Sequence, residues 1–353
     1  MSKIRSSIAL VVGCVWALGL GGAAFAADMG LPTKAPPPPA PPPLDIHGFV
    51  ETDWESFLIN PQGQALINHG AVTTLAGLDW VLYKNKGGFI NKITAGGLVA
   101  ADWSSNFPGY WGAFEPSQNG DLFDVVMAID ASVTFGQYWT LTDTYFNVYS
   151  GDVAPSAAAA AAGFGTIGFT FLNFNELRLG LNDSFTGWPI TFNPYVSWYY
   201  EFAGGSAAVM PACFDCQVGS DFTIGMTPTL NMKMWGAPWL TFKAPTYVTV
   251  GPTSFWGCAF GAACSTPAVA GSPGSSGGVG VFTTGLTAVA SLTWIPANYG
   301  SWYAKAGFQW YDIVNANLQA SNAFSICGLA FATCNTNNTN SVFVGFAGLG
   351  VGF

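Results

Sequence analysis

The sequence predicts an all-β protein: a transmembrane, antiparallel, up-and-down β-barrel of about twelve strands, with short periplasmic turns and long extracellular loops. Three observations predict this fold. Half of the 353 residues are hydrophobic while only 8% are charged, against roughly 25% in an average soluble domain. After the first 27 residues, no run of about 18 apolar residues provides a membrane helix, and a bilayer accepts only helices or closed barrels. The apolar residues instead alternate with polar ones along most of the chain.

This alternation identifies the individual strands, because successive side chains of a strand point to opposite faces. Segment 221–233 is the clearest case, with Phe222 and Ile224 on one face and Asp221 and Thr223 on the other. In a lipid-embedded barrel the apolar face points outward and the polar face lines the lumen. Each such segment is long enough to cross the bilayer. The twelve segments are 45–60, 72–84, 89–103, 123–135, 138–149, 166–181, 190–202, 221–233, 239–250, 280–294, 301–313 and 341–353.

The connections between these segments alternate between short and long, which favours the same fold independently. The short links are 85–88, 136–137, 182–189, 234–238 and 295–300. The long links are 61–71, 104–122, 150–165, 203–220, 251–279 and 315–340. With the N-terminus in the periplasm, the short links become periplasmic turns and the long ones extracellular loops. Tryptophans near strand ends suit the aromatic girdles at the two headgroup levels. They are Trp54, Trp80, Trp103, Trp139, Trp235, Trp239, Trp294, Trp302 and Trp310.

The N-terminus has the layout of a secretory signal. Lys3 and Arg5 precede an apolar run over 8–20 and a small-residue cleavage site at 24–26. A competing lipoprotein-type site ends at Cys14, but cleavage there would leave an apolar stretch on the mature chain where a polar tether is expected.

We therefore expect a signal peptide over 1–26, a Pro-rich periplasmic spacer over 27–44 and a barrel over 45–353. Cleavage after residue 26 removes two basic residues and no acid, so the formal net charge goes from −9 to −11. This acidic balance argues against nucleic acid as a partner.

The last strand carries the most specific motif of the chain. Phe353 is a terminal aromatic residue, and Val351, Leu349 and Ala347 are apolar residues at the alternate preceding positions. In this the sequence resembles bacterial outer-membrane β-barrel, or porin-like, proteins, and its mature start over 27–32 looks like that of some alphaproteobacterial members. The resemblance implies that the chain resides in the outer membrane and contacts its lipid. It also implies that the barrel assembly machinery recognises the last strand, with Phe353 as the signal. It transfers no solute specificity, and it leaves a homo-oligomer open.

Six cysteines fall as three local pairs, each inside one expected outer loop. Six cysteines allow fifteen connectivities, but the spacing favours three short-range disulfides in an oxidising compartment. A redox or metal site at Cys213 and Cys216 is the alternative, and the strand-to-helix setting and further ligands that it needs are missing. The disulfide candidates are Cys213, Cys216, Cys258, Cys264, Cys327 and Cys334.

No catalytic motif survives inspection. The glycine pattern over 163–168 precedes a strand rather than a helix, and the hydrolase-type pattern over 274–278 lies in a Gly/Ser-rich loop. The two histidines are His47, at the start of the first strand, and His69, in the first outer loop. A barrel lipid hydrolase built on His69 and a serine stays as an alternative, but we expect surface histidines, no enzyme, no cofactor and no metal.

Charged side chains on the polar faces are the candidate pore lining. Glu51, Asp53 and Glu55 stand at i, i+2 and i+4 on one face of the first strand, beside His47. Because Arg or Lys on the lipid face costs about 2–4 kcal/mol at the midplane, we expect the charges to point inward and the lipid face to be nearly free of them. The pore-lining candidates are Glu51, Asp53, Glu55, Asp79, Lys92, Asp102, Asp130, Glu176, Arg178, Glu201, Lys243 and Lys305.

These observations predict a porin that passes small hydrophilic solutes by diffusion. Charges in a pore select ions, and the excess of acids predicts a weak preference for cations or neutral solutes. Besides the lipid hydrolase, one alternative remains: the same charges can merely close a narrow lumen, and the chain would then be a structural or adhesive surface barrel whose disulfide-stapled loops bind partners. The alanine run 157–162 is either a short helix that folds into the mouth or a flexible loop.

Overall fold

The structure is a computed structural model that describes residues 45–63, 65–67, 70–104, 122–150, 172–203, 219–256, 277–316, 318–319, 322 and 340–353. All of them belong to one compact unit, Leu44–Phe353. Several sequence predictions lie outside the described residues: the signal peptide, the spacer, His69, the alanine run 157–162, the glycine pattern 163–168, the first three residues of the hydrolase-type pattern 274–278, and all six loop cysteines.

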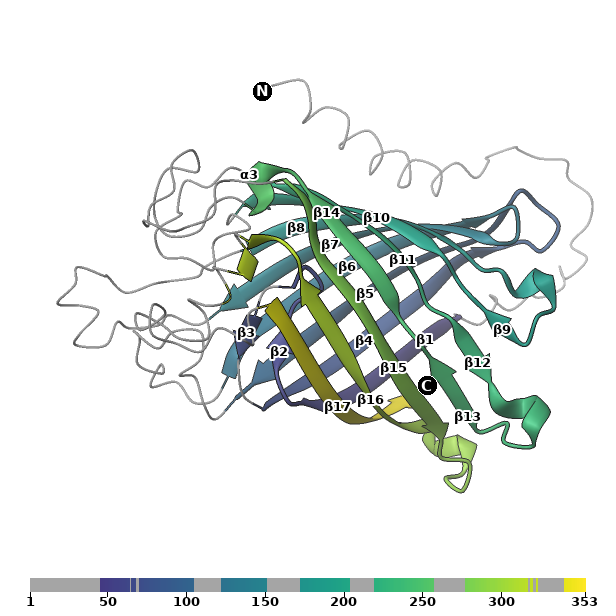
Figure 1. The fold of residues 1–353 in the computed structure, drawn as a ribbon. Helices are drawn as coiled ribbons and strands as arrows, with labels where there is room; N and C mark the ends of the chain where they lie inside the picture. The colour runs from purple at the N-terminus through teal and green to yellow at the C-terminus, as the bar shows by residue number, and fades with distance from the viewer. Residues whose placement is uncertain are drawn as a thin grey trace, which may run out of the picture. The chain divides into compact units, whose positions relative to one another are not determined.

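The described residues form a barrel of twelve antiparallel strands, as the alternation predicted (Figure 1). Nine cross it without a break: β1 (Ile46–Glu55), β4 (Ala71–Lys84), β5 (Ile90–Trp103), β6 (Leu122–Phe135), β7 (Trp139–Ser150), β8 (Leu172–Leu181), β15 (Gly278–Ser291), β16 (Ser301–Ile313) and β17 (Ser341–Gly352). Three cross in two pieces: β9 (Ile190–Thr191) with β10 (Tyr195–Ala203), β11 (Ser220–Met226) with β12 (Thr229–Asn231), and β13 (Leu240–Lys243) with β14 (Thr246–Gly251).

Prolines explain the three breaks. Pro194, Pro228 and Pro245 stand in the gaps between the paired pieces. Proline has no N–H to give to a β-ladder, yet each of these residues still accepts a hydrogen bond from a neighbouring strand through its carbonyl oxygen. The wall is therefore interrupted locally without being opened.

The barrel closes where the two ends of the chain meet. β1 pairs with β17 on one side and with β4 on the other, and Val50 lies opposite Val351. The backbone of Phe353 exchanges two hydrogen bonds with Gly48, of 2.8 and 2.9 Å. A closed sheet leaves no unpaired edge, which is the condition for backbone in lipid. The Phe353 ring is 64% exposed, and its role as an assembly signal stays a prediction.

The alternation of short and long connections is also confirmed. We call the end with the short connections the inner end and the other the outer end. The inner connections include three 3₁₀ helices: η1 (Ser184–Thr186), η2 (Met232–Trp235) and η3 (Ala297–Tyr299). Among the described residues, no helix is both long and apolar enough to span a membrane.

Three strands end two or more residues before the predicted boundary. The first strand ends at Glu55 rather than residue 60, and β2 (Leu58–Ile59) pairs with β3 (Ala65–Ile67) in a separate two-stranded sheet. The strand over 221–233 ends at Asn231, where the Asn231 side chain accepts the Lys233 N–H and caps η2. β15 ends at Ser291 rather than residue 294.

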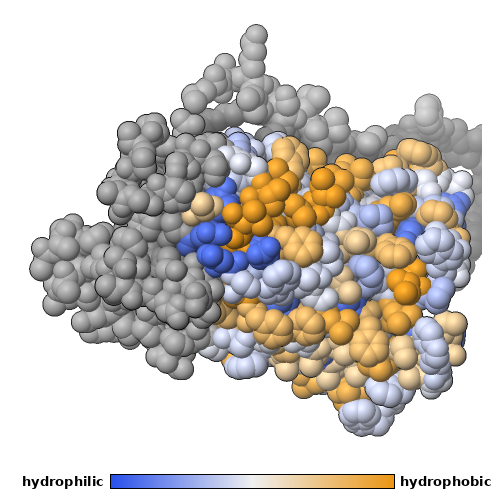
Figure 2. Space-filling view, in the orientation of Figure 1, coloured by the Kyte–Doolittle hydropathy of each residue, from blue (hydrophilic) through white to orange (hydrophobic). Residues whose placement is uncertain are grey.

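Apolar residues form large patches on the face of the barrel wall that Figure 2 shows. Leu78, Ile129 and Ile224 are each more than half exposed, as expected for side chains that face lipid. Of the nine tryptophans expected at strand margins, the following seven are more than 40% exposed: Trp54, Trp80, Trp103, Trp139, Trp235, Trp239 and Trp294.

A second apolar region lies inside the outer half of the barrel. We call it the outer apolar cluster. It joins inward-facing residues of the wall to residues of β2, of the short helix α3 (Thr253–Trp256) and of the segment after β16. Its members are Ile59, Tyr199, Phe255, Trp256, Val281, Tyr311, Ile313, Leu318, Val342 and Val344. The sequence did not predict this cluster, and it narrows the outer part of the lumen.

Asp183 holds the inner connection between β8 and β9. Its carboxylate accepts the backbone N–H of Phe192 at 2.8 Å and that of Asn193 at 3.0 Å. Burial raises the pKa of the Asp183 carboxyl, but these two donors favour the ionised form more, so its pKa lies below the ordinary value. Asn193 has a positive φ of 48°, and the Asp183 bonds help to hold that unusual conformation.

Replacing Asp183 with Ala should lower the free energy of unfolding by about 2 kcal/mol at pH 7, the value of hydrogen bonds to a charged acceptor. Because the pKa of Asp183 is lowered, its contribution is present at neutral pH and is lost as the pH falls through that pKa. The difference between the two proteins, measured by urea unfolding of the folded barrel, should therefore shrink as the pH is lowered through the acidic range. The control is Asp312→Ala, and an Asp183 effect independent of pH would contradict the prediction.

Candidate functional site

The three acids of β1 lie in the lumen, where Lys305 of β16 joins two of them. Lys305 Nζ is 2.6 Å from Glu51 Oε1 and 2.7 Å from Asp53 Oδ2. The Tyr303 hydroxyl donates to the other carboxylate oxygen of Glu51. The side chains of Lys305, Glu51 and Asp53 are 20%, 13% and 8% exposed, so this group is largely shielded from solvent.

Glycines of β17 let these side chains meet, because β17 lies between β1 and β16. Lys305 and Asp53 both stand opposite Gly348 in the ladder. A Cβ at Gly348 would collide with the Asp53 carboxylate, and one at Gly350 would collide with the Tyr303 ring. The ion pair thus reaches across a strand that offers no side chain at that level.

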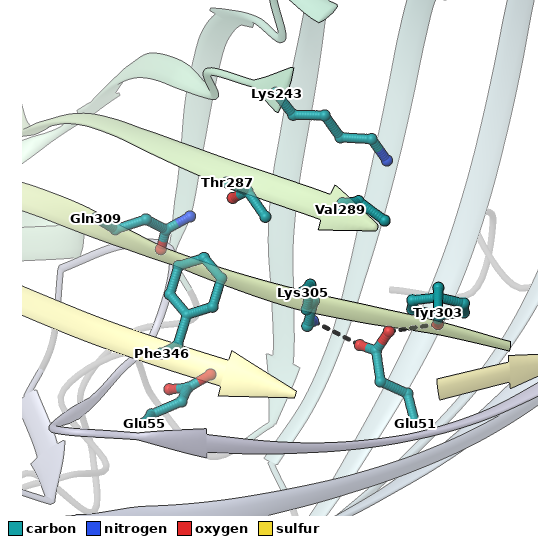
Figure 3. A pocket seen from close by; sticks show the side chains of 9 residues that line it. All are labelled: Glu51, Glu55, Lys243, Thr287, Val289, Tyr303, Lys305, Gln309 and Phe346. Atoms are coloured by element: carbon teal, nitrogen blue, oxygen red, sulfur yellow. Dashed lines mark hydrogen bonds and ion pairs between the residues drawn. The ribbon is translucent and has the colours of Figure 1, made fainter. Parts of the chain in front are cut away.

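This group borders a cavity of about 500 Å³ inside the barrel (Figure 3). Lys243 from β13 and Glu55 point into it, together with apolar and amide side chains. The lining residues are Glu51, Glu55, Lys243, Thr287, Val289, Tyr303, Lys305, Gln309 and Phe346. Among the described residues, Lys243 has no ion pair, so it presents a free cation to the cavity.

The other candidate residues are spread around the lumen wall. Asp102 accepts a hydrogen bond from Thr73. Asp79 and Asp130 flank Gly96, since a Cβ there would meet both carboxylates. These acids are not joined to the Lys305 group by any hydrogen bond or ion pair between described residues.

The basic candidates away from Lys305 lie near the inner end. Arg178 stacks its guanidinium on the Tyr195 ring, 3.6 Å from the ring centre, and it forms no ion pair with Glu176 among the described side chains. Lys92 is the third residue of β5. His47 is exposed and lies 2.7 Å from Asp45, which agrees with a surface histidine.

Two acids are buried beside the outer apolar cluster. Glu201 is 0% exposed and Asp221 1%, and none of their four carboxylate oxygens has a hydrogen-bond partner among the described residues. Tyr199, a member of the cluster, lies directly opposite Asp221 and two residues before Glu201. When ionised, these acids put uncompensated negative charge in a region of low dielectric constant.

The distribution of charge along the barrel axis is strongly uneven. The described basic residues all lie in inner connections or in the inner half of their strands: Lys84, Lys86, Lys92, Arg178, Lys233, Lys243 and Lys305. The sequence of the outer connections contains acids but no lysine or arginine. Among the described residues, the cations therefore lie in the inner half of the barrel, and the outer half carries acids.

Sequence reasoning missed Tyr303, Phe346 and Asp221 as lumen residues. Strict alternation from Lys305 would have placed Tyr303 inward, and alternation from Leu349 would have placed Phe346 inward. The alternation places Asp221 on the polar face of its strand, but Asp221 is not among the predicted pore-lining residues. Among the described residues, no group of three His, Cys, Asp or Glu side chains is arranged to hold a metal ion.

No family model and no curated protein matches the chain. Solved structures do match it at low similarity. The β domain of the Bordetella autotransporter BrkA is 10% identical, with a TM-score of 0.38 over 87% of this chain and 99% of that one. OprB of Pseudomonas putida is 8% identical, with a TM-score of 0.36 over 88% and 94%. OmpT, an outer membrane protein of Vibrio cholerae, is 8% identical, with a TM-score of 0.34 over 88% and 97%. These neighbours are bacterial outer-membrane β-barrel proteins, and at these scores none of their properties transfers to this chain.

Proposed function

We propose that the chain is an outer-membrane channel through which small hydrophilic solutes diffuse passively, with a weak preference for cations and neutral solutes over anions. The observation that carries the proposal is a closed barrel with an apolar outer wall and a charged cavity inside it. Lys243 is exposed and faces this cavity without an ion pair among the described residues, so its charge acts on a solute that enters the cavity.

The axial charge distribution supports the preference for cations. A cation that approaches the outer end meets acids and no basic residue in the outer connections. Further in, the cavity presents the carboxylates of Glu51 and Glu55. Negative clefts with low-dielectric walls raise the local concentration of cations and exclude anions.

A closed barrel is the second candidate function, and the outer apolar cluster favours it. Ten buried residues, among them Trp256 and Ile59, narrow the outer half of the lumen, and hydrophobic constrictions block ions when water leaves them. In that case the barrel would anchor its outer connections, which would bind partners. No observation on the described residues favours the lipid hydrolase.

Single-channel recording in a planar bilayer separates the two candidates. The folded, purified chain should produce discrete conductance steps, and their reversal potential in a salt gradient should show cation preference. Folded protein that inserts without conductance would overturn the channel proposal and leave the closed barrel.

Neutralising the acids of β1 should reverse the balance of charge in the cavity. The variant Glu51→Gln, Asp53→Asn, Glu55→Gln removes three negative charges and leaves Lys243 and Lys305. We expect the cation-to-anion permeability ratio to fall at least about threefold, since one unit charge about 7 Å from a permeating ion in water contributes roughly 0.6 kcal/mol. The reversal potential measures this ratio. Asp45→Asn, outside the lumen, is the matched control, and an unchanged reversal potential in the triple variant would remove the acids from the mechanism.

A further inference from the structure

A group of polar side chains lies on the outer wall of the barrel, where lipid-facing apolar residues are expected. β7 contributes Asp143, Tyr145 and Asn147, and β8 contributes Asn173 and Asn175. We call this group the β7–β8 polar patch. It is an exception to the prediction that the lipid face is nearly free of charge, because Asp143 belongs to it.

The lumen residues of the same strands show that the patch points outward. Phe146 stacks on Phe174 with ring centres 4.5 Å apart, and Phe174 packs on Tyr199 of the outer apolar cluster. Side chains one position away on a strand point to the opposite face. Tyr145 and Asn173 therefore face away from the lumen, and Tyr145 is 38% exposed.

The patch lies at the depth of the membrane's apolar band. β7 begins at Trp139, which is 41% exposed at the inner end. Asp143 follows four residues later, about 10 Å higher for a strand rise of about 3.3 Å and a tilt of about 40°. The apolar band is about 25 Å tall, so Asp143 lies near its middle. Met127 and Ile129 on the neighbouring β6 are 49% and 66% exposed and apolar.

The patch satisfies part of its hydrogen-bonding capacity internally. The Tyr145 hydroxyl donates to Asn173 Oδ1 at 2.8 Å, and Asn147 Nδ2 donates to the same oxygen at 2.7 Å. Asn175 Nδ2 donates to Asp143 Oδ1. Four groups have no partner among the described residues: Asp143 Oδ2, Asn147 Oδ1, Asn173 Nδ2 and Asn175 Oδ1. No water is available in the apolar band to satisfy them.

We propose that the β7–β8 polar patch is the surface through which two copies of this chain associate side by side in the membrane. The patch offers a carboxylate acceptor in Asp143 and amide donors in Asn173 and Asn175, so it is complementary to itself. A two-fold axis through the patch brings the amides of one copy to the Asp143 of the other. Polar side chains are known to join transmembrane segments in this way, because their alternative is an unsatisfied group in hydrocarbon.

The surroundings favour a second copy over other occupants. A lipid headgroup does not reach the middle of the apolar band. On the neighbouring β10, Trp198 and Phe202 are 38% and 46% exposed and form an aromatic border of the kind that is enriched in protein interfaces. The patch and this border together form a continuous surface on β7, β8 and β10.

Cysteine cross-linking in intact membranes tests the proposal without weakening the barrel. In an Asp143→Cys variant, the two-fold axis places the new thiols of two copies on the two sides of the same interface, and a short bifunctional thiol reagent should join them into a product of twice the mass. Leu286→Cys is the matched control, because Leu286 is 41% exposed on the outer wall of β15, five strands from β7 around the barrel. The unaltered chain, with its seven native cysteines, is the blank.

A dimer product at position 143 and none at position 286 supports the proposal. Equal products at both positions, or none at position 143, would overturn it. A product of a different mass at 143 would assign the patch to another protein and also overturn it. Light scattering of the purified chain in detergent gives a second measurement: Asp143→Leu together with Asn175→Leu should weaken the dimer about tenfold or more, while Leu286→Asn should leave the dimer unchanged.

Discussion

Replacing Lys305 with Met is expected to lower the free energy of unfolding of the barrel by about 2–3 kcal/mol, toward the low end for breaking a buried ion pair. Lys305 Nζ lies within 2.7 Å of carboxylate oxygens of both Glu51 and Asp53. Met has a similar length and no charge, so the substitution keeps much of the packing and leaves two shielded carboxylates without a cation. The loss is smaller than for a dry interior because the cavity beside Lys305 holds space for water.

Asp53 has little freedom to find another partner after this change. Its carboxylate lies over Gly348, its Oδ1 atom already has no hydrogen-bond partner among the described residues, and the residue is 5% exposed. The same substitution removes one positive charge from the wall of the cavity. If the chain is a channel, its cation-to-anion permeability ratio should rise about threefold, in the direction opposite to the effect of neutralising the acids.

Lys243→Met separates these two effects. Lys243 lines the same cavity but forms no ion pair with described residues. It should therefore change the reversal potential in the same direction as Lys305→Met and leave the urea midpoint nearly unchanged. If both variants lose the same stability, the loss comes from altered packing or net charge rather than from the broken pair at Lys305.

The twelve strands could be predicted from the sequence because most of them carry one apolar and one polar face. β11 shows this well: Phe222 and Ile224 are 54% and 65% exposed on the outer wall, and Asp221 is 1% exposed inside. The lengths of the connections gave independent information. Successive connections of an up-and-down barrel lie at alternate ends, so a strict alternation of short and long connections places all the short ones at one end and all the long ones at the other. Neither signal depends on the identity of any single residue.

The phase of β7 was not predictable in the same way. One face carries Trp139, Leu141 and Asp143, and the other carries threonines and Phe146. Neither face is clearly the apolar one, so the alternation does not say which side meets lipid. The structure decides it through the contact of Phe146 with Phe174 inside the barrel, and this leaves Asp143 on the outer wall.

The lumen was predicted in part. Period two placed Glu51, Asp53 and Glu55 on one face. Lys305, the partner of Glu51 and Asp53, lies two strands away, and the contact has room because Gly348 has no side chain. The outer apolar cluster was missed for a related reason. Near its outer end β17 is apolar on both faces, with Val342 and Val344 inside and Phe343 outside, and a pattern of polarity cannot then reveal what fills the lumen.

Trp256→Ala is expected to have the largest effect on stability and to show whether the outer apolar cluster obstructs the lumen. Trp256 is 5% exposed, its ring packs edge-on against Phe255 at 4.6 Å between centres, and its Nε1 donates to the Gly278 carbonyl at 3.2 Å. Removing such a side chain costs about 3–5 kcal/mol through lost burial and the cavity left behind. A Cβ at Gly280 would collide with the Trp256 ring. The indole therefore fills the space that a side chain at position 280 would occupy, and its removal leaves that space empty.

The space that Trp256→Ala leaves behind also decides between the channel and the closed barrel. If the cluster is a hydrophobic constriction on the solute path, the space left by the indole should admit water, and single-channel conductance should rise about twofold or more. A barrel that is closed in its natural form should begin to conduct. Trp294→Ala is the control, since Trp294 is 75% exposed in an inner connection and should change neither conductance nor the urea midpoint by much. If Trp256→Ala loses stability but conducts exactly as the natural chain does, Trp256 packs against the wall beside the path, and the constriction must be sought at other residues of the cluster.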